Sequence, residues 1–193
     1  MYSKNDINIE NDIKALSTYI SAFSMIKLKK LYKVFTSTKY PKATILENKL
    51  LNDSFCILTH GTIRHYTIDS NTSDEQTLSF KLSGNLLCHY GTATEATECL
   101  SCLSECTILS ISNVILEEIG EEINLKTYSL NIIKENLELE VALLRMTPEK
   151  RYTKLCKQYQ NLFLTVPLKY IASFLGITPQ ALCRIRKRLL ITP

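Results

Sequence analysis

The sequence predicts an α+β fold in which an antiparallel β-roll with flanking helices precedes a long helix and a C-terminal helix-turn-helix. Three observations support this prediction. Apolar residues recur at helical spacing near the N-terminus, strand-like runs separated by turn residues occupy roughly residues 43–111, and helical spacing returns from residue 113 onward. We therefore expect a roll at residues 1–118, a long helix at 119–145 and a terminal domain at 146–193.

The first part begins with helical spacing from Ile7 to about Phe35, which predicts two short helices. Runs rich in Thr, Ile, Tyr, Phe and Leu follow, and turn residues such as His60–Gly61 and Ser83–Gly84–Asn85 separate them. In the clearest run, residues 78–83, apolar and polar side chains alternate strictly and so occupy opposite faces. Regular spacing of strands and turns over about 70 residues predicts an antiparallel barrel or sandwich.

Residues 113–145 return to helical spacing and carry two neighbouring apolar stripes. One stripe consists of Leu130, Ile133, Leu137, Val141 and Leu144, and the other of Ile132, Leu139 and Leu143. If one stripe docks on the chain's own roll, the other is left for a second copy of the chain. We expect a homodimer through residues 119–145; the alternative is a helix wholly buried in its own domain.

A start signal for a helix opens the terminal domain, with Thr147 as the N-cap and Pro148 at the first helical position. This helix is expected to extend to about Leu162. Its Tyr152 and Leu155 belong to an apolar face, and most of its basic residues lie elsewhere.

Residues 168–188 meet the steric demands of a helix-turn-helix. Ala172 is small where two helices approach closely, and Gly176 can adopt the left-handed conformation that ends a helix. Thr178 caps the second helix, with Pro179 at its first position. The apolar residues that we expect to face inward or fill the turn are Ile171, Leu175, Ile177, Leu182 and Ile185.

In such a motif the start of the second helix enters the major groove of DNA. Gln180 and Arg184 lie four positions apart on its outer face and can bond to adenine and guanine edges respectively. We predict that these two residues read bases. The residues expected to hold phosphates are Lys169, Thr178, Lys187 and Arg188, with Arg186 as a further candidate. The alternative is a helical hairpin whose basic face is solvated or binds a protein.

The charge of the chain is distributed unevenly. Residues 1–144 contain 13 Lys and Arg against 18 Asp and Glu, a net charge of −5, whereas residues 145–193 contain 10 against Glu149 alone, a net charge of +9. A polyanion suits such a segment, because neutralising phosphates releases condensed counterions. A solvated basic surface is the other interpretation of the charge taken alone.

With a roll, a long helix and this motif in order, the whole chain resembles the cyclic-AMP receptor protein/fumarate-nitrate regulator (Crp/Fnr) superfamily of transcription regulators. The residues HGTIRHY and DEQTLSFKLSGN resemble its strand-turn pattern, and TPEKRYTKLCKQYQNLFLTVPLKYIASFLGITPQALCRIRKRL resembles its C-terminal domain. The resemblance is to the compact members. It implies a cyclic-nucleotide-binding-like jelly roll, a dimerising helix and a winged-helix-like reader of a palindromic operator in double-stranded DNA.

Family members that bind cyclic AMP have a Gly-Glu pair followed by an Arg with a Ser or Thr. Here Gly84 is followed by Asn85, and no Lys or Arg occurs from Asn85 to Glu122. The nearby acidic residues Glu95, Glu98 and Glu105 would repel a cyclic phosphate. We expect a degenerate pocket that does not bind cyclic AMP. The effector is not defined by these residues, and we predict no cofactor.

Cysteines and histidines offer another kind of sensor. Cys99, Cys102 and Cys106 form a spaced group close to Cys88, and iron–sulfur regulators of this superfamily carry cysteine clusters. Cysteine also serves as a small buried apolar residue, so we predict no metal at this group. The histidines, which could ligate haem or zinc but are expected to be structural or exposed, are His60, His65 and His89.

These patterns favour a regulator over other classes of protein. The sequence contains no phosphate-binding glycine loop and no recognisable nucleophile motif, so we predict neither catalytic residues nor enzymatic activity. Short apolar runs, a polar N-terminus and an odd number of cysteines predict a cytoplasmic protein without a membrane partner. RNA polymerase is a further candidate partner. The alternative function is a ligand-binding or protein-interaction module that keeps the fold but has lost DNA binding.

Overall fold

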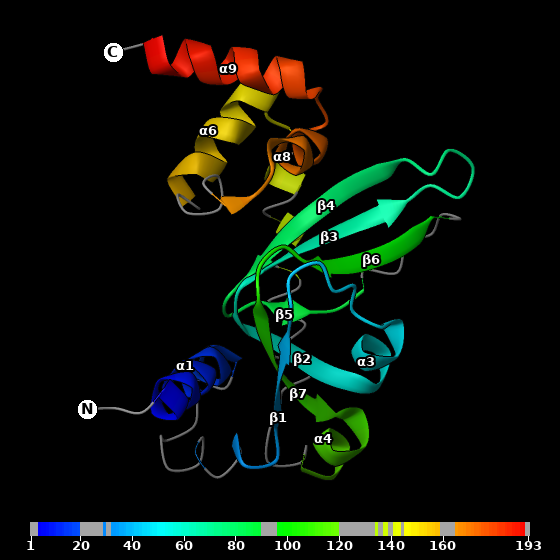
Figure 1. Ribbon diagram of the computed structural model, residues 1–193, viewed down its shortest axis with the longest axis vertical. Coiled ribbons are helices and arrows are strands. Elements are labelled where there is room, and N and C mark those ends of the chain that lie inside the picture. The colour runs from blue at the N-terminus through cyan, green and yellow to red at the C-terminus, as the bar shows by residue number, and fades with distance from the viewer. Residues whose placement is uncertain are drawn as a thin grey trace.

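The computed structural model describes residues 4–19, 29, 32–89, 96–119, 134, 137–138, 141–143, 145–158 and 165–191. The strands and the first helices lie at one end of the long axis of the molecule, and the C-terminal helices lie at the other (Figure 1). The last helix is the element farthest from the N-terminal strands in this view.

Among the described residues, seven strands form two antiparallel sheets. The first sheet has the order β1 (Thr36–Tyr40), β7 (Cys106–Ser112), β2 (Ser54–His60) and β5 (Leu86–Leu87), and the second has the order β4 (Glu75–Leu82), β3 (Thr62–Ile68) and β6 (Thr97–Cys102). The strand-rich, antiparallel region predicted from the sequence is confirmed. Side chains from both sheets pack together between them, and this core includes Cys56, Leu58, Ile63, Leu100 and Ile108.

Two elements differ from the predicted strand region. Strand β1 begins at Thr36, before the predicted start, and pairs with β7 at the edge of its sheet. Its sequence TSTKY has no apolar alternation because none of its side chains is fully buried. The short helix α3 (Asn48–Asp53) lies where we expected strands, and Leu51 is its buried residue.

The helices α1 (Lys4–Tyr19) and α4 (Asn113–Ile119) lie against the first sheet (Figure 1). Ile13 and Leu16 of α1 pack with Ile57 of β2 and Leu109 of β7. Helix α1 corresponds to the first of the two predicted N-terminal helices. The second prediction falls mostly on residues outside the described part of the chain.

Strand β4 keeps the predicted alternation, but its polar face is the one that is more deeply buried. Ser79 and Lys81 are 8% and 6% exposed and lie on the inside of the roll, whereas Phe80 and Leu82 pack against the C-terminal helices. The strand therefore contacts protein on both faces. Buried polar groups need hydrogen-bond partners, so the interior of the roll must supply them to this face of β4.

The predicted dimerisation helix at 119–145 lies largely outside the described residues. Its described positions are helical at Lys134, Leu137–Glu138 and Val141–Leu143. Leu143 is 5% exposed and belongs to the core of the C-terminal helices, whereas Leu137 and Val141 are 47% and 49% exposed. The described residues of the two apolar stripes thus differ in burial.

The described part of the C-terminal end contains the helices α6 (Pro148–Gln158), α8 (Leu168–Leu175) and α9 (Pro179–Ile191). Helix α6 begins at Pro148 as predicted, and the Thr147 hydroxyl accepts a hydrogen bond from the Lys150 N–H at 3.4 Å. The buried residues shared by these helices are Leu143, Tyr152, Leu155, Val166, Ile171, Ala172, Leu175, Leu182 and Ile185.

Candidate nucleic-acid interface

Helices α8 and α9 are joined by a tight turn at Gly176. Gly176 has φ 66° and ψ 35°, the left-handed conformation that ends α8, and its N–H donates to the Ser173 carbonyl at 3.0 Å. The Ile177 N–H donates to the carbonyl of Ala172, also at 3.0 Å. Ala172 is fully buried, so the predicted roles of the small residue and of the glycine are both confirmed.

Helix α9 begins with the predicted cap. The Thr178 side-chain oxygen accepts a hydrogen bond from the Ala181 N–H at 3.2 Å, and Pro179 occupies the first helical position. The inward positions Leu182 and Ile185 are 0% and 6% exposed. With its inner face fixed by these contacts, α9 presents Gln180, Arg184 and Lys187 to solvent.

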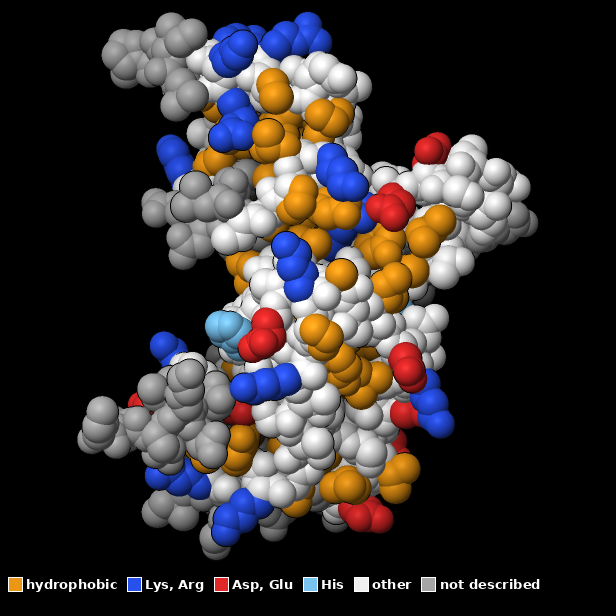
Figure 2. All heavy atoms as spheres, in the orientation of Figure 1, with side chains coloured by type: hydrophobic (Ala, Val, Ile, Leu, Met, Phe, Trp, Pro, Cys, Tyr) orange, Lys and Arg blue, Asp and Glu red, His pale blue; other side chains and the backbone are white. Residues whose placement is uncertain are grey.

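The two predicted base readers, Gln180 and Arg184, are both exposed on α9. Lys187 and Thr178 are also exposed, as is Lys169 near the start of α8. Figure 2 shows Lys and Arg side chains gathered at the end of the molecule that α9 forms. A groove beside α9 is lined by Arg184, Lys187 and Arg188 together with residues from the start of α6.

Two arginines of α9 have protein partners. An Arg188 guanidinium nitrogen lies 3.2 Å from a Glu149 carboxylate oxygen of α6, so this predicted phosphate ligand is partly neutralised. Arg186 is half-buried and hydrogen-bonds Tyr152. Burial and Cys156 raise the pKa of Tyr152 to about 12, and Arg186 acts in the opposite direction. Arg186 is therefore a structural contact between α9 and α6.

Contacts between α8 and the second sheet were missed by sequence reasoning. The Ser173 hydroxyl accepts a hydrogen bond from the Thr77 N–H at 2.9 Å and donates to the Glu75 carbonyl at 3.4 Å. The ring centroids of Phe80 and Phe174 are 5.7 Å apart. In the sequence this contact is indicated only by the aromatic residues Phe80 and Phe174, and the sequence does not show that these two rings pack together.

Arg64 of β3 lies at the centre of the same contact. Its guanidinium carbon is 4.1 Å from the ring centroid of Tyr66 and 3.9 Å from that of Tyr170. Its nitrogens donate to the Thr77 hydroxyl at 2.8 Å and to the Glu75 carboxylate. The side chain is almost fully buried, and these partners compensate its charge.

Inside the roll, His65 of β3 and Glu98 of β6 form a buried hydrogen bond. Burial and the neighbouring Lys81 ammonium lower the pKa of His65 to about 4, although Glu98 acts in the opposite direction. His65 is therefore neutral at physiological pH. His89, in the segment after β5, places its Nδ1 atom 3.5 Å from a Glu98 carboxylate oxygen.

The interior also revises the argument about cyclic nucleotides. Gly84 has a φ of 90°, and the Asn85 side chain accepts a hydrogen bond from the Leu82 N–H at 2.8 Å, so Asn85 stabilises the turn. The sequence from Asn85 to Glu122 contains the acidic Glu98 and no Lys or Arg. The roll nevertheless contains Lys81, because the cation comes from the neighbouring strand β4.

The three cysteines of the candidate cluster do not converge. Cys99 and Cys102 lie on opposite faces of β6: Cys102 is buried between the sheets, and Cys99 is near Tyr66 on the other face. Cys106 is also buried, and the Cys102 thiol hydrogen-bonds it, an interaction that lowers the pKa of Cys106. Cys102 and Cys106 thus serve as core residues.

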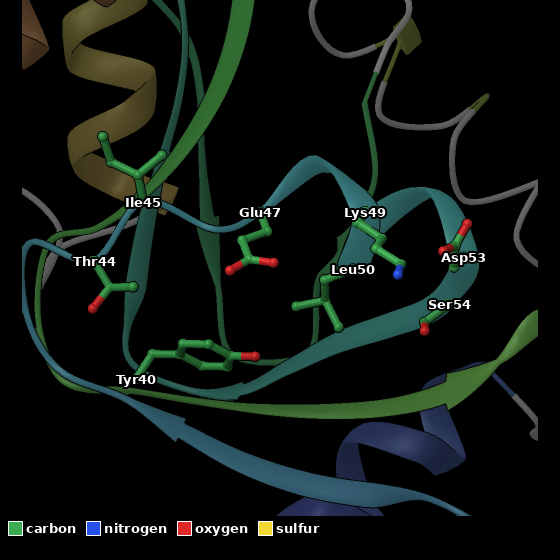
Figure 3. Close-up of a pocket in the computed structure, with 8 residues that line it drawn as sticks. All are labelled: Tyr40, Thr44, Ile45, Glu47, Lys49, Leu50, Asp53 and Ser54. Carbon is green, nitrogen blue, oxygen red and sulfur yellow. The ribbon is translucent and has the colours of Figure 1, made fainter.

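A separate groove of about 410 Å³ lies between the end of β1 and α3 (Figure 3). Its lining residues are Tyr40, Thr44, Ile45, Glu47, Lys49, Leu50, Asp53 and Ser54. It contains none of the predicted site residues, and its charged side chains are of both signs. We assign no role to it.

The fold matches structures of Crp/Fnr-family regulators and of proteins with cyclic-nucleotide-binding domains over most of the chain. Neither a protein-family model nor a curated protein sequence matches the chain. Among the described residues, no helix is both long enough and apolar enough to cross a membrane.

Three solved structures illustrate the match. FixK2 from Bradyrhizobium japonicum is 16% identical, with a TM-score of 0.63 over 81% of this chain and 84% of that one. A cyclic nucleotide-binding domain protein from Listeria monocytogenes is 14% identical, with a TM-score of 0.62 over 95% and 90%. A protein assigned to the Crp/Fnr family from Eubacterium rectale is 14% identical, with a TM-score of 0.60 over 89% and 85%. At these identities the likeness defines the fold.

Proposed function

We propose that the protein is a sequence-specific DNA-binding transcription regulator of the Crp/Fnr type. The observation that carries the proposal is the arrangement of α9. Its start is capped by Thr178, its inner face is buried, and Gln180 and Arg184 are exposed within a segment of net charge +9. Two such side chains on the first turns of a helix match the donor and acceptor pattern of base edges in the major groove.

In this proposal residues 1–118 form the sensor, 119–145 the dimer contact and 146–193 the helix-turn-helix domain. A homodimer presents two copies of α9, which suits a palindromic operator. Support for the dimer comes from Leu137 and Val141, which are half-exposed on one stripe, whereas Leu143 on the other is buried.

Cyclic AMP is not the effector in this proposal. The side chain of Asn85 is engaged in its own turn, and Glu98 lies inside the roll. Lys81 supplies one positive charge there, but the negative charge of Glu98 acts on the same neighbours, His65 and Cys88. A cyclic phosphate would therefore meet a carboxylate in a site of low dielectric.

Selection of genomic DNA fragments by the purified protein tests the main proposal. The recovered operator is then titrated by fluorescence anisotropy with wild type, Gln180→Ala, Arg184→Ala and the control Lys157→Ala, which removes a cation from α6. We expect the two α9 variants to lose about 1–3 kcal/mol each and to relax specificity at one base pair. Uniform binding of unselected DNA by all four proteins would contradict the proposal and favour the protein-interaction module.

A further inference from the structure

We propose that the interior of the roll binds a divalent first-row transition-metal cation through His65, His89 and Glu98. One donor atom from each of these three side chains lies within 4.8 Å of the others. Within the described part of the chain, this is the group of histidine, cysteine and acidic residues that meets such a spacing. The three residues come from β3, the segment after β5, and β6, so the fold brings them together.

The donor set suits this class of ion. Two imidazoles and one carboxylate are ligands that zinc and ferrous iron accept, and they leave a coordination position open for water. A histidine ligates a metal through a neutral imidazole nitrogen, and the His65 Nε2 atom already faces the Glu98 carboxylate. Glu98 is 9% exposed, and a cation is favoured beside a carboxylate at such a buried position.

His89 gives an independent indication. Both of its ring nitrogens are buried, and neither has a hydrogen-bond partner among the described residues. Such atoms are costly unless something satisfies them. Because Nδ1 already lies 3.5 Å from Glu98, a bound ion would give the ring a partner without a change in its direction.

Only a modest rearrangement is needed. Ligands about 2.1 Å from one tetrahedral ion stand about 3.4 Å apart, so donors as far apart as 4.8 Å must approach by about 1 Å or a little more. The hydrogen-bonded donor atoms of His65 and Glu98 must instead separate to admit the ion. His89 can supply this movement because it is half-buried and follows a strand of only two residues. His65 would bind through Nε2 with its proton on Nδ1, where the Ser79 hydroxyl lies at 3.4 Å and can accept it.

The Lys81 ammonium opposes the binding of a metal ion at this site. Its side chain is buried on β4, and its positive charge acts on both His65 and Cys88. A cation at the same place would be repelled by this ammonium. The site is therefore expected to bind its ion more weakly than it would without Lys81.

Anaerobic titration of the full chain with Co²⁺ tests the proposal, with the ligand-field absorbance and calorimetry as readouts. We expect one ion per chain. Binding should weaken about tenfold or more in His89→Ala and Glu98→Gln, remain unchanged in His60→Ala, which alters an exposed histidine of β2, and strengthen in Lys81→Met. Glu98→Gln keeps the shape of the side chain, and circular dichroism of each metal-free variant verifies that it folds.

Two results would overturn the proposal. One is equal Co²⁺ affinity in wild type, His89→Ala and Glu98→Gln. The other is a thiolate-to-cobalt charge-transfer band that persists in the folded His89→Ala protein, which would assign the ion to the cysteines. The readout is metal binding, so the outcome does not depend on whether the chain binds DNA.

Discussion

The guanidinium of Arg64 stacks on the ring of Tyr170, with its central carbon 3.9 Å from the ring centroid. This contact joins β3 to α8, and therefore joins the roll to the helices that carry the proposed DNA-binding surface. Arg64 is next to His65 in the sequence, and the two side chains point to opposite faces of the sheet. A single strand thus contacts both the roll interior and α8.

Replacement of Tyr170 by Ala is expected to reduce the free energy of unfolding by about 1–2 kcal/mol, because the buried Arg64 loses a stacking partner. Tyr170→Phe keeps the ring and should lose much less. Urea denaturation followed by circular dichroism measures both changes. Equal losses for the two variants would indicate that the hydroxyl, and not the stacking, matters.

Two of the glycines with positive φ, Gly61 and Gly176, should respond differently to replacement by Ala. At Gly176 an added Cβ meets no neighbour, so the cost is the left-handed conformation alone, about 1 kcal/mol. At Gly61 the added Cβ would collide with the Glu105 carbonyl and the Cys106 sulfur, so we expect a much larger loss or failure to fold. Thermal melts of both variants compare the two costs. Similar melting temperatures would refute the steric explanation.

The salt dependence of operator binding should distinguish the basic residues. Lys187→Ala is expected to reduce the slope of log affinity against log salt by about 0.9, as loss of one phosphate contact does. Arg188→Ala should reduce it less, because Glu149 already pairs with Arg188 at 3.2 Å. Anisotropy titrations over a range of salt concentrations give the slopes, and Lys39→Ala on β1 serves as the control. An unchanged slope in Lys187→Ala would remove it from the set of phosphate contacts.

A charge on the half-exposed stripe of the 119–145 segment should break the dimer. Leu137→Glu and Val141→Glu are each expected to yield monomers, because a buried unpaired carboxylate is costly in an apolar interface. Analytical ultracentrifugation gives the mass in solution. The exposed Lys134→Gln is the matched control and should remain dimeric. A dimeric Val141→Glu would place the contact elsewhere.

Calorimetric titration with cyclic AMP should give no saturable heat. The expected cause is the carboxylate of Glu98 inside the roll, together with the absence of a basic residue in the segment that follows Asn85. Micromolar affinity would contradict this expectation and would assign Lys81 the role of phosphate ligand.

Much of the fold was predictable because its signals are local. The order of helices, strands and helices follows from residue periodicity, and the turn of α8 and α9 follows from Ala172, Gly176, Thr178 and Pro179, whose roles depend on backbone geometry within a few positions. Strand β1 and helix α3 were missed, because an edge strand and a short helix bury too little surface to impose a period.

The sequence by itself determined the strand-rich roll, the capped start of α9 and the basic character of the C-terminal segment. Only the tertiary structure decided that Cys99 lies apart from Cys102 and Cys106, that Lys81 enters the roll, and that His65, His89 and Glu98 meet there. The physical reason is distance along the chain. Caps and periods depend on neighbouring residues, whereas a cluster assembled from β3, β6 and the segment after β5 depends on strand register, which no single segment encodes.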